Sequence, residues 1–134
     1  MLAAGKAGLM LSVYIVQLNV VGLQAGIDWY TGVLGFRVSK ENNFSQHGTT
    51  VQLEHDQGFR LILHNAKIPA RIDYPNDVQT MVVWQTQDLA ASMSEMKSKG
   101  VEFIFSEPQK INVGNFVAFR DPFGNVHELI ELKK

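Results

Sequence analysis

The side chains of this sequence that can do chemistry are imidazoles and carboxylates. Its 134 residues include four histidines, 13 Asp and Glu residues and no cysteine. Disulfides, zinc–thiolate sites and thiol nucleophiles are therefore excluded, and we expect a cytoplasmic location. The sequence has no G-x-S-x-G nucleophile elbow and no glycine-rich phosphate loop before a helix. Histidines and carboxylates remain as candidates for metal binding or acid–base catalysis.

Two of these groups, His64 and Glu128, lie in stretches with strand-like alternation. His127 precedes Glu128 directly, so in a strand the two side chains point to opposite faces and cannot form a catalytic dyad. His47 and His55 lie in or beside turn-forming segments, where we expect surface positions. His64 is thus the histidine whose place on a sheet face matters most.

The elements that must position these groups occur twice in the same order. The first half predicts a strand at 13–21, a helix from Leu23 to a stop at Gly35, and strands at 36–40, 49–55 and 59–64. The second half predicts a strand at 78–86, a helix capped by Asp88 and stopped by Gly100, and strands at 101–105, 115–120 and 125–132. The pattern is β-α-β-β-β in both halves.

The offset between the halves indicates an internal duplication. Leu23 and Leu89 are 66 positions apart, and so are Gly58 and Gly124. We predict an α+β fold of two βαβββ modules that form curved mixed sheets around a cavity. The expected organisation is a flexible tail at 1–10, a first module at 11–67, a linker at 68–77 and a second module at 78–134, all in one structural domain.

Composition excludes several classes of partner. The formal net charge is −1, without a clustered basic surface for nucleic acid or an anionic membrane. No stretch approaches the roughly 20 apolar residues that a transmembrane helix requires. We therefore expect neither nucleic acid nor membrane as a partner.

Three segments carry a family resemblance. Residues 22–38, GLQAGIDWYTGVLGFRV, and 88–103, DLAASMSEMKSKGVEF, resemble the helix segments of the vicinal oxygen chelate superfamily. Residues 119–131, FRDPFGNVHELIE, are similar to its DP-x-G-N-x-x-E-L ending. This superfamily includes glyoxalase I, extradiol dioxygenases, fosfomycin-modifying enzymes and bleomycin-binding resistance proteins. The resemblance implies paired βαβββ modules around a shared cavity, but a fold of this kind does not select one function.

The resemblance also implies four positions for a metal, and most of them hold apolar residues here. In metal-using relatives the ligands come from the first and last strand of each module. Counting from the matched motifs places them at Ile15, Ile62, Met81 and Glu128. Isoleucine has no donor atom and a thioether is soft, so three of the four cannot hold a hard or borderline cation. We therefore expect no metal and no cofactor; a non-standard site using His64 with Glu128 is the alternative.

Alternation also predicts the lining of the cavity. The all-apolar faces of the strands, with Leu61, Leu63 and Trp84, should pack on the helices. The mixed faces should form an apolar cavity that suits an organic ligand. Its expected ligand-binding residues are Ile15, Gln17, Ile62, His64, Met81, Val83 and Glu128.

Three functions remain open from the sequence. The first is a metal-free protein that binds a small organic molecule, similar to the bleomycin-binding branch and to antibiotic resistance proteins. The second is an enzyme: a metal-dependent lyase or dioxygenase with rearranged ligands, or a metal-free isomerase with Glu128 as its catalytic group. The third is a structural or regulatory protein whose cavity is filled by side chains. The resemblance further implies a homodimer, with the modules paired within or between chains.

Overall fold

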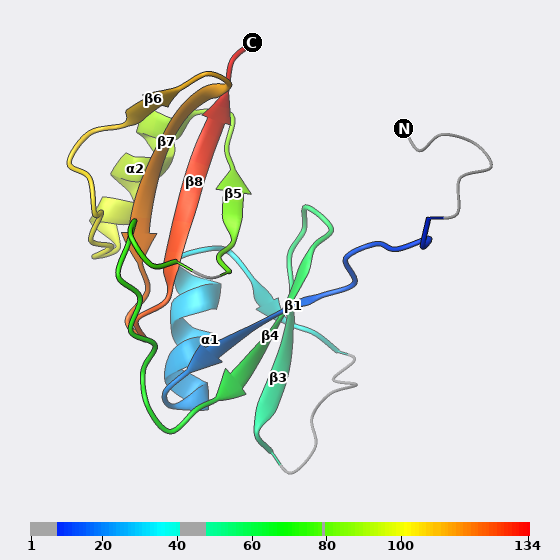
Figure 1. Ribbon diagram of the computed structural model, residues 1–134. Helices are drawn as coiled ribbons and strands as arrows, with labels where there is room; N and C mark the ends of the chain where they lie inside the picture. Colours follow the sequence, from blue (N-terminus) through cyan, green and yellow to red (C-terminus); the bar gives the residue numbers. More distant parts are fainter. Residues whose placement is uncertain (1–7, 41–47, 79) are drawn as a thin grey trace.

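The computed structural model describes residues 8–40, 48–78 and 80–134. Figure 1 shows two sheets, each accompanied by one helix. The first module contains β1 (Val16–Val20), α1 (Leu23–Gly32), β2 (Arg37–Val38), β3 (Thr50–Glu54) and β4 (Arg60–Asn65). The second contains β5 (Val83–Gln85), α2 (Leu89–Ser98), β6 (Gln109–Ile111), β7 (Gly114–Arg120) and β8 (Val126–Leu132). The predicted α+β fold of two similar modules is confirmed.

The two sheets have the same topology. Their strand orders are β1-β4-β3-β2 and β5-β8-β7-β6. In both, the first and last strands of the module pair in parallel, and the remaining pairs are antiparallel. Each helix makes the crossover that a parallel pair requires. The helices begin at Leu23 and Leu89, the residues that the sequence offset matches.

The helices are short, and one of them has the predicted cap. Both contain 10 residues, and the Asp88 side chain accepts a hydrogen bond from the Ala91 backbone N–H at 3.0 Å. Such a cap satisfies one of the backbone donors that a helix start leaves unpaired. No helix among the described residues is long and apolar enough to span a membrane.

The predicted strand at 101–105 is wrong as a regular strand. Only an isolated bridge between Phe103 and Phe119 forms there, supported by a hydrogen bond from the Ile104 N–H to the Ala118 carbonyl at 2.8 Å. The regular strand beside β7 is β6, which follows Pro108. Proline has no backbone N–H to donate, so the segment before β6 cannot continue the ladder without a break.

Apolar side chains between the helices and sheets form two core clusters. The first is centred on Tyr30, Leu53 and Leu63, and the second on Met93, Val117 and Phe119. Trp29, Leu34 and Trp84 pack against both clusters. The two modules therefore share one continuous apolar interior, which fixes their relative position.

Candidate functional site

Gln17, Ile62 and His64 lie on the sheet face opposite the first core cluster, whereas Ile15 precedes β1. Ile62 is nevertheless buried, at 4% exposed. The parallel register places Gln17 beside Ile62 and Asn19 beside His64. The side chains of Leu61 and Leu63 point the other way. They are 1% and 0% exposed and belong to the first core cluster. The alternation of β1 and β4 therefore follows the prediction. His64 has Asn19 and Thr50 as its register neighbours on the two flanking strands.

The second module repeats this arrangement with Glu128 on the corresponding face. Val83 pairs with Glu128, while Trp84 pairs with Leu129 on the core side. Val83 is 49% exposed, whereas Leu129 is 6% exposed. His127 is fully buried on the core side of β8, so it points away from Glu128 as predicted.

The four positions that the sequence resemblance predicts for a metal carry three side chains that do not suit a hard or borderline cation. Ile15, Ile62 and Met81 supply no imidazole nitrogen and no carboxylate oxygen. The fourth residue, Glu128, accepts a hydrogen bond at Oε2 from the Tyr74 hydroxyl at 2.6 Å. Across the described ranges, no three His, Cys, Asp or Glu side chains gather closely enough to hold an ion. The alternative pairing of His64 with Glu128 would join residues of two different sheets.

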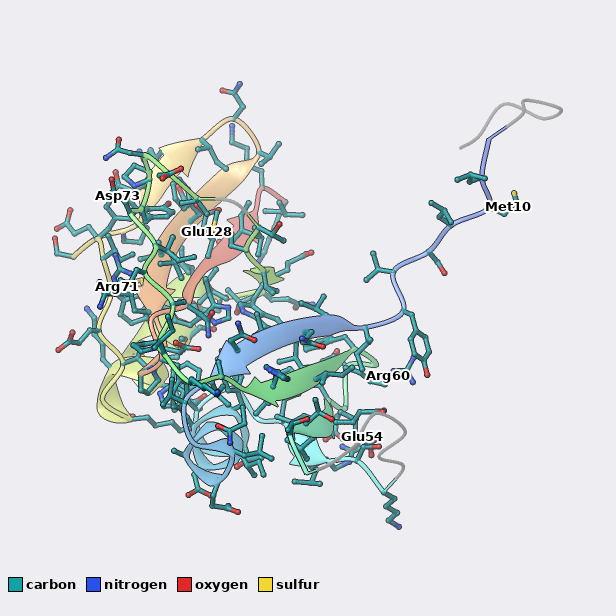
Figure 2. The ribbon with its side chains drawn as sticks, turned by 60° about the horizontal axis from the view of Figure 1, so that its bottom comes forward. Met10, Glu54, Arg60, Arg71, Asp73 and Glu128 are labelled. Atoms are coloured by element: carbon teal, nitrogen blue, oxygen red, sulfur yellow. The ribbon has the colours of Figure 1, made fainter. Side chains whose placement is uncertain are left out.

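No sequence pattern predicted the contact between Tyr74 and Glu128. Tyr74 belongs to the inter-module linker (68–77), and Figure 2 shows the linker crossing the second sheet on the side of Glu128. Arg120 of β7 donates a hydrogen bond to the Ile72 carbonyl of this linker at 3.2 Å. Burial, together with the Glu128 carboxylate, raises the pKa of Tyr74. Tyr74 of the linker thus hydrogen-bonds the Glu128 carboxylate, which is the catalytic group of the isomerase alternative.

A large cavity lies where the two modules meet, and we call it the junction cavity. Its volume is about 740 Å³. Its lining residues come from β1, the β3–β4 turn, β4 and β5: Val16, Gln57, Phe59, Arg60, Leu61, Val82, Val83, Trp84, Gln85, Thr86 and Gln87. Of the seven sequence-predicted ligand residues, only Val83 lines it.

A cluster of aromatic rings forms one side of the junction cavity. The Phe59 ring stacks on His55 with centroids 4.5 Å apart and an interplanar angle of 12°. It also lies 5.2 Å from Trp84 and 5.5 Å from Phe36, measured between centroids. His55 is half-buried, with Nε2 3.0 Å from the Leu34 carbonyl oxygen, so the expected surface position is wrong for it. His47 lies outside the described residues.

Two smaller cavities flank the junction cavity. One of about 250 Å³ shares Phe59 and Trp84 with it and extends toward α2. The other, of about 390 Å³, is lined by Gln17 and Met81 together with residues of β1 and the linker. Gln17 and Met81 are therefore the one pair of the seven predicted residues that line the same cavity among these three. Ile15, Ile62, His64 and Glu128 line none of them.

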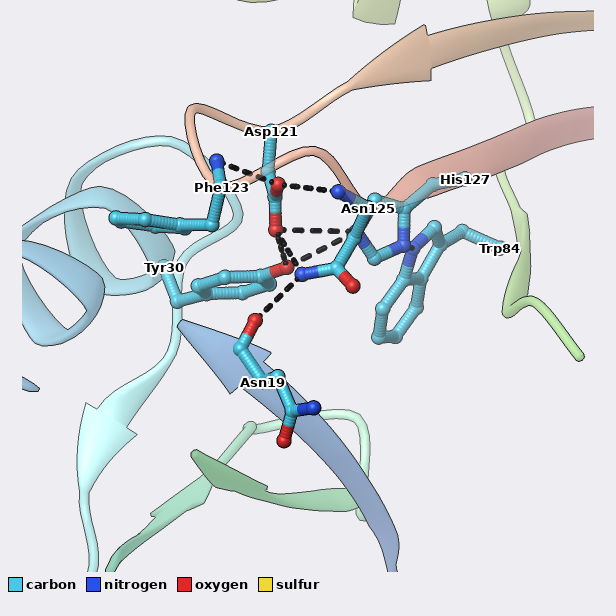
Figure 3. Close-up of polar contacts among 7 residues, drawn as sticks. All are labelled: Asn19, Tyr30, Trp84, Asp121, Phe123, Asn125 and His127. Atoms are coloured by element: carbon cyan, nitrogen blue, oxygen red, sulfur yellow. Dashed lines mark hydrogen bonds and ion pairs between the residues drawn. The ribbon is translucent and has the colours of Figure 1, made fainter. Parts of the chain in front are cut away.

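A buried polar network connects the two modules (Figure 3). The Tyr30 hydroxyl donates to Asp121 Oδ2 at 2.5 Å and lies 2.9 Å from His127 Nε2. The Trp84 indole N–H donates to His127 Nδ1 at 3.2 Å. Because an indole can only donate, Nδ1 carries no proton, and Nε2–H must donate to the Tyr30 oxygen. The hydrogen bonds therefore run in one direction, from Trp84 through His127 and Tyr30 to the Asp121 carboxylate.

Asp121 is the final acceptor in this series of hydrogen bonds and also stabilises the β7–β8 turn. Its Oδ1 accepts hydrogen bonds from the backbone N–H groups of Phe123 and Asn125, both at 2.9 Å. The Asn125 side-chain amide donates to Asp121 Oδ2 at 2.8 Å and to the Asn19 carbonyl at 2.7 Å. The turn is thereby tied to the end of β1, in the other module.

The environment shifts two pKa values in this network. Burial and the charge of Asp121 raise the pKa of Tyr30. Burial also acts to raise the pKa of Asp121, but contacts from His127, Tyr30 and Asn125 outweigh it and hold that pKa below its usual value. Tyr30 and His127 are 0% exposed, and Asp121 is 5% exposed. A ligand in solution cannot reach Tyr30, Asp121 or His127, so these three groups hold the modules together and are not ligand contacts.

Comparison with known proteins agrees with this architecture. Over 117 residues the chain is 25% identical to the uncharacterized protein YetH of Bacillus subtilis (strain 168), covering 87% of this chain and 94% of that protein. The crystal structure of TnmS3, an antibiotic binding protein from Streptomyces sp. CB03234, superposes with a TM-score of 0.72 at 21% identity, covering 94% of this chain and 100% of that chain.

A second solved structure has a similar fold at lower identity. The fosfomycin resistance protein FosX from Listeria monocytogenes has a TM-score of 0.73 at 14% identity, covering 93% of this chain and 94% of that chain. At these identities the two structures establish the fold alone. The sequence model of the Glyoxalase/Bleomycin resistance protein/Dioxygenase superfamily matches residues 13–129, which is most of the chain. The chain therefore belongs to the glyoxalase/bleomycin resistance protein/dioxygenase superfamily.

Proposed function

We propose that this protein binds a small organic molecule in the junction cavity and does so without a metal. The observation that carries the proposal is the cavity itself. Its volume of about 740 Å³ falls within the range of about 300–1,000 Å³ that is typical of small-molecule sites. Phe59, Val83 and Trp84 supply apolar surface, and a few glutamines and Arg60 supply hydrogen-bonding groups. This mixture is typical of a site for an organic ligand.

Two further observations support a binding protein over a metal enzyme. The positions that the resemblance predicts for a metal carry Ile15, Ile62 and Met81, which cannot coordinate a hard cation. The remaining carboxylate, of Glu128, is engaged by Tyr74. Because TnmS3, which has a similar fold, is an antibiotic binding protein, antibiotics are the first class of compound to test.

The first experiment is a thermal-shift screen of aromatic and amphiphilic compounds against the purified protein. A ligand at 100 times its Kd should add about 2.7 kcal/mol to the free energy of unfolding. Metal analysis after purification without chelator accompanies the screen, and we expect no stoichiometric metal. Stoichiometric nickel, zinc, manganese or iron would refute the metal-free proposal. A screen in which no compound raises the melting temperature would refute ligand binding.

A pair of matched variants tests the location of the site. Val83 is 49% exposed on β5 and lines the junction cavity, so Val83→Trp should fill the cavity and abolish binding. Val38 is 47% exposed on β2 and lines none of the three cavities, so Val38→Trp should bind as the wild type does. If Val83→Trp retains full affinity, the ligand binds elsewhere.

We also propose that the chain forms a homodimer. Supporting this, the segment before β1 is extended and carries side chains of Leu9, Met10, Leu11 and Val13 that are 80–90% exposed. Large apolar side chains grouped in this way favour contact with another protein surface. Light scattering coupled to size-exclusion chromatography should give twice the mass of one chain, and a monomer mass at micromolar concentration would contradict the proposal.

A further inference from the structure

Of the described residues that line the junction cavity, Arg60 is the single charged one. The other lining residues are apolar or carry neutral amide or hydroxyl groups. Phe59 and Val83 are 37% and 49% exposed at the cavity wall. The cavity therefore combines apolar surface with one permanent positive charge, because a guanidinium does not lose its proton in proteins.

Within the described part of the chain, Arg60 forms no ion pair with a carboxylate. Its cross-strand neighbour is Glu54 on β3, but the Glu54 carboxylate accepts hydrogen bonds from Arg37 at 3.1 Å and from the Ser39 hydroxyl at 3.3 Å. Arg37 also pairs with Asp56 in the following turn. The acidic groups near Arg60 are thus directed toward the opposite edge of the sheet.

The contacts that Arg60 does make are weak. Its Nη1 and Nη2 atoms lie 3.4 Å from the hydroxyl and carbonyl oxygens of Tyr14, which is at the long end of the hydrogen-bond range. Its guanidinium carbon lies 4.2 Å from the centroid of the Tyr14 ring. Figure 2 shows Arg60 beside the segment that precedes β1, away from Glu128. A bidentate acid would bind this guanidinium more strongly than the two neutral oxygens of Tyr14 at 3.4 Å do.

We propose that the junction cavity selects aromatic compounds that carry an acidic group, with the acid on Arg60 and the ring against Phe59 and Trp84. The inference rests on the proposed function, since it names the class of ligand for the same cavity. Phe59 stacks on His55 through one face, and Trp84 lies tilted at 46° to it, so the rings form an angled apolar wall beside the guanidinium. Among the residues that the structure describes, no acidic side chain lines the cavity to repel the ligand.

Two fluorescent probes that differ by one acidic group test this selectivity. They are 8-anilinonaphthalene-1-sulfonate and its uncharged counterpart N-phenyl-1-naphthylamine. The wild type should bind the sulfonate at least about tenfold more tightly, at one site per chain, as expected for a hydrogen bond to a charged group. Val83→Trp should abolish the binding of both probes, which separates the cavity from non-specific binding to apolar surface.

Substitution of the arginine isolates the contribution of its charge. Arg60→Met should weaken sulfonate binding about tenfold and leave the affinity for the neutral probe within about twofold. Arg71→Met is the control, since Arg71 is exposed, lies on the linker and makes the same change in net charge. It should leave both affinities unchanged. Near-ultraviolet circular dichroism verifies that each variant retains its tertiary packing.

The outcomes distinguish the two proposals. If the wild type binds both probes equally, or if Arg60→Met weakens both to the same extent, the acid selectivity is refuted while ligand binding stands. If the wild type binds neither probe, the acid selectivity is refuted as well. The thermal-shift screen then decides separately whether the cavity binds any compound.

Discussion

Replacing Tyr30 by phenylalanine removes one oxygen atom from the buried network and breaks two hydrogen bonds. One is the bond that the hydroxyl donates to Asp121 at 2.5 Å, and the other joins it to His127 Nε2 at 2.9 Å. The aromatic ring, which is 0% exposed, keeps its shape and its packing against Trp29 and Phe36. The substitution therefore isolates the polar contribution of this contact between modules.

The expected loss of stability follows from the groups that remain. A hydrogen bond to a charged acceptor contributes about 1.5–3 kcal/mol, and a buried donor without a partner costs about 1–3 kcal/mol. Asp121 Oδ2 retains the amide of Asn125, whereas the His127 Nε2–H loses its acceptor. Because such terms are not additive, we expect Tyr30→Phe to lower the free energy of unfolding by about 3 kcal/mol. That is a large fraction of the roughly 5–15 kcal/mol that stabilises a domain.

Urea denaturation at pH 7, followed by tryptophan fluorescence and circular dichroism, measures the effect. Tyr74→Phe is the matched control, because it removes a single hydrogen bond to a carboxylate, Glu128, from a tyrosine that is only partly buried. Because solvent screens this partly exposed contact, we expect a loss of about 1 kcal/mol or less for this control. A loss below about 1 kcal/mol for Tyr30→Phe, or equal losses for the two variants, would refute the assignment of the network as an inter-module lock.

Two further predictions concern the same region. A Cβ atom on Gly124 (φ +87°) would overlap the Ala70 carbonyl oxygen, whereas Gly100 (φ +86°) has open space around it. Gly124→Ala should therefore cost about 3 kcal/mol or more and Gly100→Ala about 1–2 kcal/mol in urea titrations, and equal costs would contradict this packing. The pKa of Asp121 lies below its ordinary value of 3.8 in the folded protein, so its contribution to stability is present above about pH 4 and is lost as the pH falls through the lower folded-state pKa. In Asp121→Asn, the free energy of unfolding should fall less steeply with decreasing pH below about pH 4. An unchanged slope would show that Asp121 does not cause the loss of stability in acid.

Local patterns were sufficient to predict most of the fold. The periodicity around Leu23 and Leu89, together with the stopping glycines, located both helices to within a few residues. The strand at 101–105 was wrong because an extended, β-branched segment beside a sheet does not have to pair along its whole length. Residues 101–105 form only the isolated bridge between Phe103 and Phe119, and the regular strand, β6, begins directly after Pro108.

The candidate site was less accessible to sequence reasoning. Alternation gave the correct sheet faces for Ile62, Leu63 and Trp84. It treated all seven predicted residues as the lining of one cavity, yet the junction cavity has only Val83 among them. Strand periodicity fixes the direction of a side chain, but it contains no information on how two sheets are oriented relative to each other.

The sequence by itself determined the duplicated βαβββ plan and the absence of metal-ligand chemistry at Ile15, Ile62 and Met81, because both depend on residue type and spacing along the chain. The tertiary structure decided which groups meet. Tyr30 and Asp121 are 91 positions apart, and Tyr74 and Glu128 are 54 positions apart. The contact between Tyr30 and Asp121 and the cavity wall that contains Arg60 arise from the packing of one module against the other, and the contact between Tyr74 and Glu128 arises from the path of the chain between β4 and β5. Local sequence patterns specify neither.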